Sequence, residues 1–312
     1  MVTRAGSVEV ELAQGPADIE SGTECTVQTR FQLCSVSKQF AAVAALLLVE
    51  SGQLDLNEPV EGWLPGGTPQ WRQITLHHLL SHTAGLPHWL EAPGLDPAVP
   101  MSITERLAAV QQGPLRTEPG AQWHYSSLGF VLAGLIVARA SGQPYPAFLA
   151  ERILSPLKLT STTVGGGPAG AAFARGFAGG QPVPPWDLDA MPGTGDIWST
   201  AGDLTRFITA LHAGELITAG SLTAMCTPHA PLDDDDAGEP RLTTTGYGYG
   251  MFTGTFGGHP AYYHPGDNPG YRSFAGWIPD RAASIVILVN REDAEVSIEG
   301  LLRQLLPAAL EP

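Results

Sequence analysis

Strand-like sequence occupies both ends of this chain, and helix-like sequence fills the region between them. Residues 7–12, SVEVEL, alternate polar and apolar side chains, and residues 26–33 are predicted to form a second strand. Further strands are predicted near the other end of the chain, at 247–252, 261–264, 272–278 and 284–290. Because strands at both ends can pair with each other, we expect an α/β fold of the α+β sandwich kind. In such a fold an antiparallel sheet is flanked by helices and carries an inserted, mainly helical lobe.

Boundary residues predict the helices. One helix begins near Ser35 and ends at Gly52, because glycine is favoured just beyond a helix C-terminus. Hydroxyl residues that can cap a first turn mark three more starts, at Thr75, Ser102 and Thr200. Residues 127–140 are apolar on nearly every side, as expected of a buried helix, and a closing helix is predicted at 296–306.

These elements suggest two lobes in a chain of 312 residues. We assign residues 1–60 plus 240–312 to a discontinuous α/β sheet lobe and residues 61–239 to a mainly helical lobe. We expect an active site in the cleft between them. The acidic run at 233–236 is interpreted as a solvated loop.

The charge balance excludes several classes of partner. The net charge is −15, whereas nucleic acids and anionic membranes are bound through clustered lysine and arginine. The longest apolar run, residues 41–49, is far shorter than the roughly 20 residues that a membrane crossing takes. We therefore expect a small-molecule or short-peptide substrate, and neither nucleic acid nor membrane as a partner.

The first residues lack the apolar segment of a secretory signal. We therefore expect a cytoplasmic protein, or a periplasmic or secreted one if its N-terminus was trimmed. The three cysteines, Cys25, Cys34 and Cys226, lie far apart without a CxxC pair, so neither a zinc ribbon nor a disulfide framework is predicted.

Lys38 is one of only two lysines in the chain and interrupts the apolar sequence CSVSKQFAAVAALLLVE. A buried lysine loses its proton readily, whereas arginine does not, so lysine suits a site that needs a neutral amine. Ser35 lies three residues earlier, on the same face of the predicted helix. Ser35 and Lys38 therefore form a candidate nucleophile and base, although a tetrapeptide S-x-x-K also arises by chance.

Several longer segments occur in the order typical of one enzyme family. They include FQLCSVSKQF, HHLLSHTAGLP, EPGAQWHYSSLGF, GTGDIWSTAGDL and HPGDNPGYRSF. Across residues 5–295 the chain resembles the serine β-lactamase and penicillin-binding-protein-like hydrolases, in particular the group with class C β-lactamases, D-aminopeptidases and S-x-x-K esterases. The resemblance implies a β-lactamase/transpeptidase-like fold.

The resemblance also implies three elements of an active site. The first is Ser35 with Lys38. The second is the triplet Tyr125-Ser126-Ser127, in which Tyr125 would act with Lys38 as a proton shuttle, accepting from Ser35 and later donating to the leaving group. Ser127 stands where the family usually has asparagine, and it offers one donor where an amide offers two.

The third element is His264-Pro265-Gly266, where the family has K-T-G or H-x-G. Gly266 would let substrate approach the strand, and the Asp267 N–H would join the Ser35 N–H in an oxyanion hole. Pro265 lacks a donor and requires an edge strand. The family's lysine offers a positive charge to a substrate carboxylate, whereas His264 is mostly neutral near pH 7, which favours substrates without an obligatory carboxylate. Arg272 is a candidate for supplying the missing positive charge.

The predicted reaction is acylation of Ser35 and hydrolysis of the acyl-enzyme, without metal or cofactor. His78 and His82 have the spacing of metal ligands on a helix, but we expect no zinc site because the sequence offers no third ligand. The preferred substrates are esters or D-amino-acid amides and peptides. The alternative function is that of a β-lactamase or D-Ala-D-Ala carboxypeptidase. A third possible function is that of a penicillin-binding sensor with little turnover.

Only six residues precede the first strand, where family members usually have a helix. A neighbouring subunit could cover that part of the sheet, so a homo-oligomer is left as an open expectation.

Overall fold

A computed structural model describes residues 1–64, 71–88, 91, 99, 101–167, 170, 172–184, 186–232, 242–292 and 297–311. Within these residues, eight strands form one antiparallel sheet in the order β10-β11-β12-β13-β14-β15-β1-β2. The strands are β1 (Val2–Arg4), β2 (Ser7–Val10), β10 (Ala230–Pro231), β11 (Leu242–Tyr247), β12 (Phe252–Phe256), β13 (His259–Asn268), β14 (Tyr271–Ile278) and β15 (Ala283–Val289).

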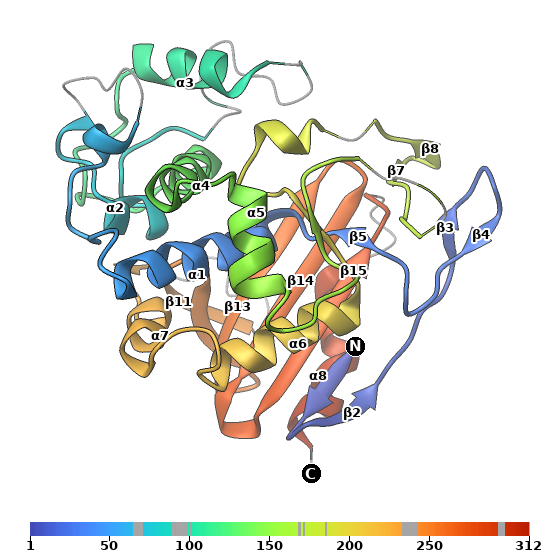
Figure 1. Ribbon diagram of the computed structural model, residues 1–312. Coiled ribbons are helices and arrows are strands. Elements are labelled where there is room, and N and C mark those ends of the chain that lie inside the picture. Colours follow the sequence, from blue (N-terminus) through green and yellow to red (C-terminus); the bar gives the residue numbers. More distant parts are fainter. Residues whose placement is uncertain are drawn as a thin grey trace.

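The two ends of the chain meet in this sheet, as predicted. Val2 of β1 pairs with Ile285 of β15, so strands from opposite ends of the sequence are direct neighbours. Between them the chain forms most of its helices, which Figure 1 shows gathered on one side of the sheet. The expected fold class is therefore confirmed, whereas the lobe boundaries at residues 60 and 240 stay a prediction.

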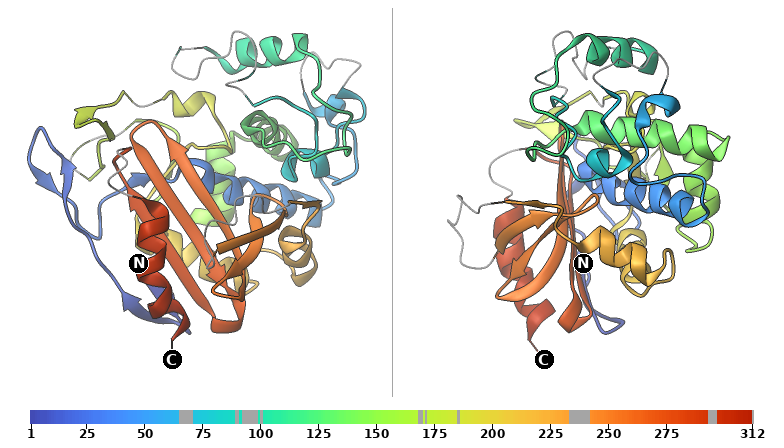
Figure 2. Two further views of the ribbon diagram at one scale, coloured as in Figure 1. Left: turned by 180° about the vertical axis from the view of Figure 1, so that it is seen from behind. Right: turned by 90° about the vertical axis from the view of Figure 1, so that its left-hand side faces the viewer.

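Both faces of the sheet are buried. Alternate residues of β14 and β15 point to opposite sides, because side chains along a strand have a period of two. Ala275 and Val286 join the core that contains the central helices. Phe274 and Ile285 instead pack with the closing helix α8 (Ile298–Leu310). Figure 2 shows the resulting layers, with α8 on one face of the sheet and the other helices opposite.

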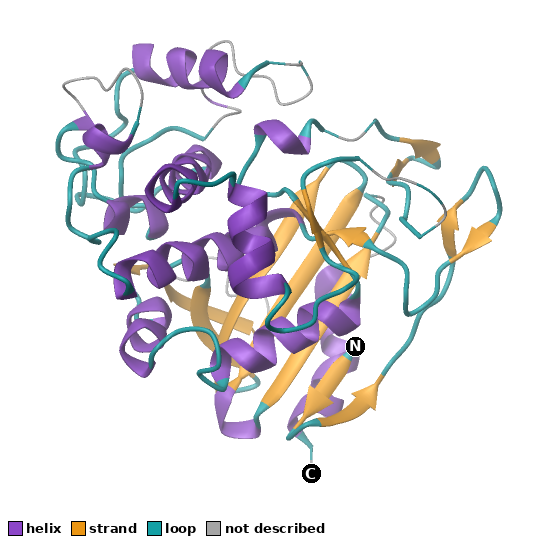
Figure 3. Cartoon of the chain, viewed as in Figure 1, coloured by secondary structure: helices purple, strands orange, loops and turns teal. Residues whose placement is uncertain are grey.

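Within the described residues, seven further α-helices cover the sheet face opposite α8 or extend from it, as Figure 3 shows. They are α1 (Ser37–Glu50), α2 (Leu76–Leu80), α3 (Ile103–Gln112), α4 (Ser127–Ser141), α5 (Tyr145–Leu149), α6 (Ala201–His212) and α7 (Ala219–Cys226). Helix α1 is buried on all sides, which explains why its sequence has no polar stripe. It ends where predicted, with Gly52 in the left-handed region at φ +73°.

Smaller strands surround the main sheet. β5 (Phe31–Gln32) pairs with β9 (Ile197–Ser199), which also pairs with β6 (Thr163–Val164). There are also two hairpins, β3 (Pro16–Asp18) with β4 (Thr23–Glu24) and β7 (Phe177–Ala178) with β8 (Gln181–Pro182), on the right of Figure 1.

The predicted strand at residues 26–33 is wrong over its first half. Only Phe31–Gln32 pair with another strand, while Thr26 and Thr29 form a local turn. The Thr26 N–H donates to the Thr29 hydroxyl at 2.9 Å, and the Thr29 N–H donates to the Thr26 carbonyl at 3.0 Å. Threonine side chains can compete in this way with the hydrogen bonds of a sheet.

The prediction of a strand at residues 247–252 is also wrong. Tyr247 ends β11, Phe252 begins β12, and the residues between them form the connection. Gly250 has φ +72°, and a Cβ there would lie 2.7 Å from the Lys38 carbonyl oxygen, so glycine is needed to bring this turn against α1.

The closing helix extends beyond its predicted end, through Pro307 to Leu310, while Val296, its predicted start, lies outside the described residues. The same holds for the acidic run at 233–236. Among the helices of the described residues, none combines the length and apolar character that a membrane crossing demands.

Candidate active site

Ser35 lies in a single 3₁₀ turn, Cys34–Val36, that leads into α1. Cys34 is buried and has φ +49°, a conformation that costs a residue with a side chain about 1–3 kcal/mol. The sheet holds this turn in place, since the Ser273 hydroxyl of β14 donates to the Leu33 carbonyl at 2.6 Å. The position of Ser35 is therefore determined by the sheet as well as by its own helix.

Gly266 of β13 packs directly against the same turn. A Cβ at this position would lie 2.7 Å from the Leu33 carbonyl oxygen and 2.8 Å from the Cys34 Cβ. Gly266 therefore permits close packing of β13 against the turn that carries Ser35. The predicted approach of substrate to this strand is a separate role and stays a prediction.

Lys38 follows Ser35 by one helical turn and is completely buried. Its Nζ lies 3.0 Å from the Ser35 Oγ and 3.1 Å from the Thr194 carbonyl oxygen. The aromatic rings of Tyr125 and Phe130 flank it, with centroids 4.9 Å and 5.7 Å from Nζ. Burial lowers the pKa of Lys38 to about 7, against the opposing influence of nearby negative groups.

Asp196 is a second buried charge-bearing group near Lys38, and sequence reasoning assigned it no role. Its Oδ2 accepts the Gly193 N–H at 3.1 Å, while its Oδ1 has no hydrogen-bond partner within the described part of the chain. Burial raises the pKa of Asp196 to about 7, and the positive charge of Lys38 acts in the opposite direction. The two groups therefore influence each other's protonation.

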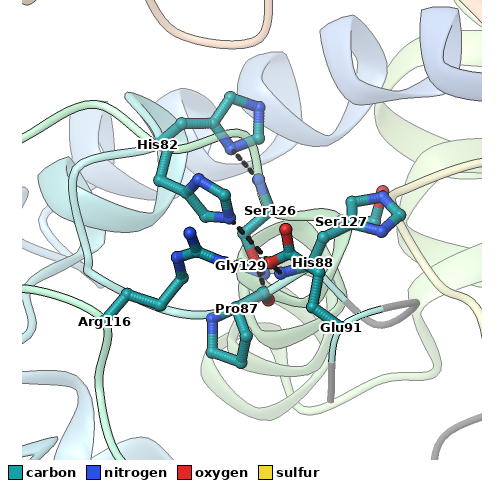
Figure 4. Close-up of polar contacts among 9 residues, drawn as sticks. His82, Pro87, His88, Glu91, Arg116, Ser126, Ser127 and Gly129 are labelled. Atoms are coloured by element: carbon teal, nitrogen blue, oxygen red, sulfur yellow. Dashed lines mark hydrogen bonds and ion pairs between the residues drawn. The ribbon is translucent and has the colours of Figure 1, made fainter.

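Tyr125 precedes α4 and is held there by its neighbour. The Ser126 N–H donates to Nδ1 of His82 at 3.1 Å, and the Ser126 hydroxyl donates to the Pro87 carbonyl at 2.8 Å (Figure 4). Burial raises the pKa of Tyr125 well above its usual value, against the effect of its hydrogen bond with Ser35. At neutral pH Tyr125 therefore keeps its proton.

Ser127 is the first residue of α4 and is almost fully buried. Its Oγ lies 3.2 Å from Nε2 of His88, a residue that sequence reasoning did not select (Figure 4). Burial, followed by the charge of Lys38, lowers the pKa of His88 to about 4, so its ring is neutral near pH 7.

His264 on β13 is buried and its ring has defined partners. Tyr247 Oη lies 3.0 Å from Nε2, and Nδ1 contacts the Pro265 carbonyl oxygen. Because a carbonyl can only accept, Nδ1 carries the hydrogen and Nε2 accepts from the tyrosine. Burial, together with the charge of Lys38, lowers the pKa of His264 to about 3, so the ring is neutral.

β13 lies inside the sheet, which at first sight contradicts the edge strand that Pro265 requires. Its pairing with β12 ends at Tyr263, however, while its pairing with β14 continues to Asn268. From His264 onward the β12 side of β13 has no paired strand among the described residues. The strand is therefore an edge over this stretch, which explains how it accommodates a proline.

A cavity of about 650 Å³ brings most of these groups together. Its lining includes Ser35, His88, Tyr125, Ser127, Trp186, Thr194, Phe252, His264, Gly266, Asp267, Asn268, Arg272 and Glu292. Six of the seven predicted site residues line it, and Lys38 contacts Ser35 from behind. The sequence did not point to three groups of the site: His88, Asp196 and the Thr194 carbonyl. The carbonyl belongs to the backbone, so the residue type at position 194 gives no indication of its role.

Arg272 lines the same cavity but is engaged by carboxylates. It forms an ion pair with Asp267, and its Nη2 lies 3.6 Å from Glu292. Nδ1 of His78 accepts the Thr75 N–H at 3.2 Å, while Nδ1 of His82 accepts the Ser126 N–H at 3.1 Å.

A family model described as Beta-lactamase matches residues 1–309. This chain belongs to the beta-lactamase family. Among curated relatives, an esterase, EstB of Burkholderia gladioli, is 35% identical over 59% of this chain. A putative penicillin-binding protein, PbpX of Bacillus subtilis strain 168, is 28% identical over 83% of it. The chain spans 50% and 63% of the lengths of these two proteins.

Solved structures agree with this assignment. A D-amino acid amidase from Ochrobactrum anthropi SV3 is 28% identical with a TM-score of 0.83, over 98% of this chain and 94% of that one. A penicillin-binding protein from Bacillus halodurans has a TM-score of 0.84 at 23% identity, over 97% of this chain and 94% of that one, and shows the shared fold. The proteins to which this chain is similar thus include an esterase and an amidase.

Proposed function

We propose that this protein is a serine hydrolase that forms an acyl-enzyme at Ser35 with ester or amide substrates. The observation that carries the proposal is the contact of 3.0 Å between Lys38 Nζ and Ser35 Oγ in a buried site. A lysine with a pKa of about 7 is partly neutral at physiological pH and can accept a proton. A protonated lysine in this place could not.

The proton steps follow from the protonation states of the site. The Lys38 amine accepts the Ser35 proton as Oγ bonds to the substrate carbonyl carbon. Tyr125 is protonated, so it donates to the departing alcohol or amine and receives a proton from Lys38. Water then hydrolyses the acyl-enzyme by the reverse sequence. The backbone N–H groups of Ser35 and Asp267 are the proposed oxyanion hole.

The preferred substrates lack an obligatory carboxylate. Neutral His264 offers no positive charge to a carboxylate, and Arg272 is already paired with Asp267 and Glu292. The esterase and the amidase among the similar proteins fit this substrate class. A β-lactamase or D-Ala-D-Ala carboxypeptidase, and a sensor that acylates with little turnover, remain the alternatives, and assembly into a homo-oligomer stays a prediction.

Three probes separate these activities: a p-nitrophenyl acyl ester, a fluorescent penicillin and a D-Ala-D-Ala peptide. Rapid turnover of the ester, with little action on the other two, is the expected result. A long-lived penicillin adduct would instead identify a sensor. Ser35→Ala should abolish turnover, whereas Ser51→Ala, at the far end of α1, should leave it unchanged. Full activity of Ser35→Ala on every probe would overturn the proposal.

A further inference from the structure

Residues 193–197 form a buried segment that contacts Lys38. The Thr194 carbonyl oxygen lies 3.1 Å from Lys38 Nζ. Within the described residues, the other hydrogen-bond partner of Nζ is the Ser35 Oγ, at 3.0 Å. The place of the amine beside the nucleophile is therefore set in part by a backbone carbonyl, and so by whatever holds that carbonyl.

The Asp196 side chain closes the turn that presents this carbonyl. Its Oδ2 accepts the Gly193 N–H at 3.1 Å, so the bond spans Thr194, which lies between the two residues in sequence. Gly193 has φ +79°, and a Cβ there would lie 2.9 Å from the Phe130 carbonyl oxygen and 3.2 Å from the Ala41 Cβ. The turn therefore packs tightly against both α1 and α4, which are neighbours in Figure 1.

The end of the segment at Asp196 is attached to the elements around the nucleophile. The Ile197 N–H donates to the Ser37 hydroxyl at 3.3 Å, and the Ile197 carbonyl accepts the Leu33 N–H at 2.8 Å. Ser37 and Leu33 lie on either side of Ser35 in sequence. Asp196 therefore has a fixed position relative to the turn that carries the nucleophile.

An acid is a costly residue for a purely structural turn. The Asp196 side chain is almost fully buried, and its Oδ1 has no hydrogen-bond partner in the described part of the chain. Burial of a carboxylate costs free energy unless the group is paired and hydrogen-bonded. Lys38 is the cation that acts on this carboxylate, and the carboxylate acts on Lys38 in turn. This placement points to a role in the active site.

The chemistry of the base explains what a fixed carbonyl contributes. Lysine has a flexible four-carbon stem, and proton transfer needs Nζ within hydrogen-bond reach of the Ser35 Oγ. The neutral amine and the ammonium both carry N–H donors, so the Thr194 carbonyl can accept from Lys38 before and after the transfer. A carbonyl held in one place therefore keeps Nζ beside Oγ throughout the reaction.

We infer that Asp196 is a positioning residue that acts on Lys38 through the Thr194 carbonyl. Its bond to the Gly193 N–H keeps the carbonyl in place, and the carbonyl keeps the amine beside Ser35. The inference rests on the proposed function, because it concerns the base that activates the nucleophile. This role needs an acceptor and no charge, so substitution can separate it from the electrostatic effect of Asp196 on Lys38.

Asp196→Asn and Asp196→Ala provide the test. Asparagine can accept the Gly193 N–H but carries no charge, whereas alanine removes both the acceptor and the charge. The measured quantity is kcat/KM for p-nitrophenyl acetate at the pH where it no longer rises. We expect Asp196→Asn to stay within about twofold of the wild type, and Asp196→Ala to fall about fivefold to tenfold, the effect of one lost hydrogen bond.

Asp203→Ala is the matched control, because it also removes a buried carboxylate that accepts a backbone N–H. Asp203 Oδ2 accepts the Ser161 N–H at 2.8 Å and the Thr162 hydroxyl at 3.0 Å. This variant should lose stability in urea unfolding and keep kcat/KM within about twofold. A fluorophosphonate that modifies Ser35 gives a second readout, and its rate should fall in Asp196→Ala by the same factor as ester hydrolysis.

The outcomes are separable. If Ser35→Ala still hydrolyses the ester, the proposed function fails. If Ser35 is essential but Asp196→Ala and Asp196→Asn reach the same kcat/KM, only the positioning role is wrong. Thermal melts show whether each variant folds. Asp196→Leu keeps the branched shape without an acceptor, and it gives the same comparison if the alanine variant does not fold.

Discussion

At the scale of single residues, the protonation of Lys38 governs when the site can react. The base must be neutral, and the pKa of Lys38 is about 7, well below its usual 10.5. We expect kcat/KM for an ester to rise with pH and to level off above an apparent pKa near 7, because the protonated amine cannot accept the Ser35 proton. A profile of kcat/KM against pH measures this rise, which is the acidic limb of the profile.

Lys38→Arg is the matched variant for that profile. Arginine keeps a positive charge and cannot be deprotonated in a protein, so we expect its rate to fall by a factor of about 100 or more at every pH. A Lys38→Arg enzyme with a normal rate would contradict the role of Lys38 as base, even if the wild-type profile had the expected shape.

Asp196 offers a second prediction at this scale. Its negative charge favours the protonated form of Lys38, so replacing it should lower the pKa of Lys38 further. In Asp196→Asn the side chain can still accept the Gly193 N–H. We expect the acidic limb of the pH–rate profile to move toward lower pH by up to about one unit. An unchanged limb, or one moved toward higher pH, would show that Asp196 does not act on Lys38.

The residues of the site differ in how far sequence could reveal them. Ser35 and Lys38 stand out because their spacing and the rarity of lysine are visible in the chain. His88 and Asp196 gain their significance only from burial and from neighbours distant in sequence, such as Ser127 and Lys38. No local pattern encodes such contacts, because they depend on how complete elements pack.

At the scale of elements, the site depends on the contact between β13 and the turn that carries Ser35. In Gly266→Ala the added Cβ would meet the Ser273 Oγ, the Leu33 carbonyl oxygen and the Cys34 Cβ, all closer than 3.0 Å. We expect the strand and the turn to separate, with a loss of stability of about 1–3 kcal/mol and a larger loss of activity. Urea unfolding and ester hydrolysis measure the two effects.

Gly62→Ala is the control for that change. Its added Cβ would have no neighbour within 4 Å, so stability and activity should stay close to those of the wild type. If Gly266→Ala behaved like Gly62→Ala, the contact between β13 and the Ser35 turn would not be needed to position the nucleophile.

Elements with strong local signals were predicted well, and those set by distant contacts were not. The caps at Thr75, Ser102 and Thr200 accept the expected backbone N–H groups, and Gly52 follows α1. Residues 247–252 resemble a strand because they alternate aromatic residues and glycine. Their turn is required by close packing of Gly248 and Gly250 against Met225 and Lys38, which sequence spacing does not reveal.

At the scale of the whole molecule, buried neutral histidines should make the fold sensitive to acid. Burial lowers the pKa values of His82, His212 and His264, the last two to about 3, from an ordinary value of 6.5. Below pH 6.5 the unfolded chain therefore binds protons that the folded chain does not, and stability falls as pH falls. His77 and His88, with pKa values lowered to about 4, add to the effect. Burial raises the pKa of Asp196, so the folded chain binds one proton there that the unfolded chain does not, and this proton stabilises the fold as pH falls. We expect a net loss of about 3 kcal/mol or more between pH 6.5 and 5 in urea unfolding.

His212→Phe identifies the source of this sensitivity. His212 lies outside the cavity, stacked on Trp277 with ring centroids 5.1 Å apart, and phenylalanine can keep that contact. The variant should lose less stability on acidification than the wild type, because one titrating group is removed. Equal losses in the two proteins would assign the effect to other groups.

The pairing of β1 with β15 also has a consequence for how the protein is made. The Ser35 turn accepts a hydrogen bond from Ser273, and Val2 of β1 pairs with Ile285 of β15. Both partners are synthesised long after the residues that they contact. At synthesis rates of roughly 5–20 residues per second, the first strand and the nucleophile precede their partners by about 10–60 seconds. During that interval the apolar α1 segment lacks its native cover, and contacts this distant in sequence form slowly. We therefore expect the growing chain to need protection from aggregation, and hydrolysis to begin only after β14 and β15 have left the ribosome.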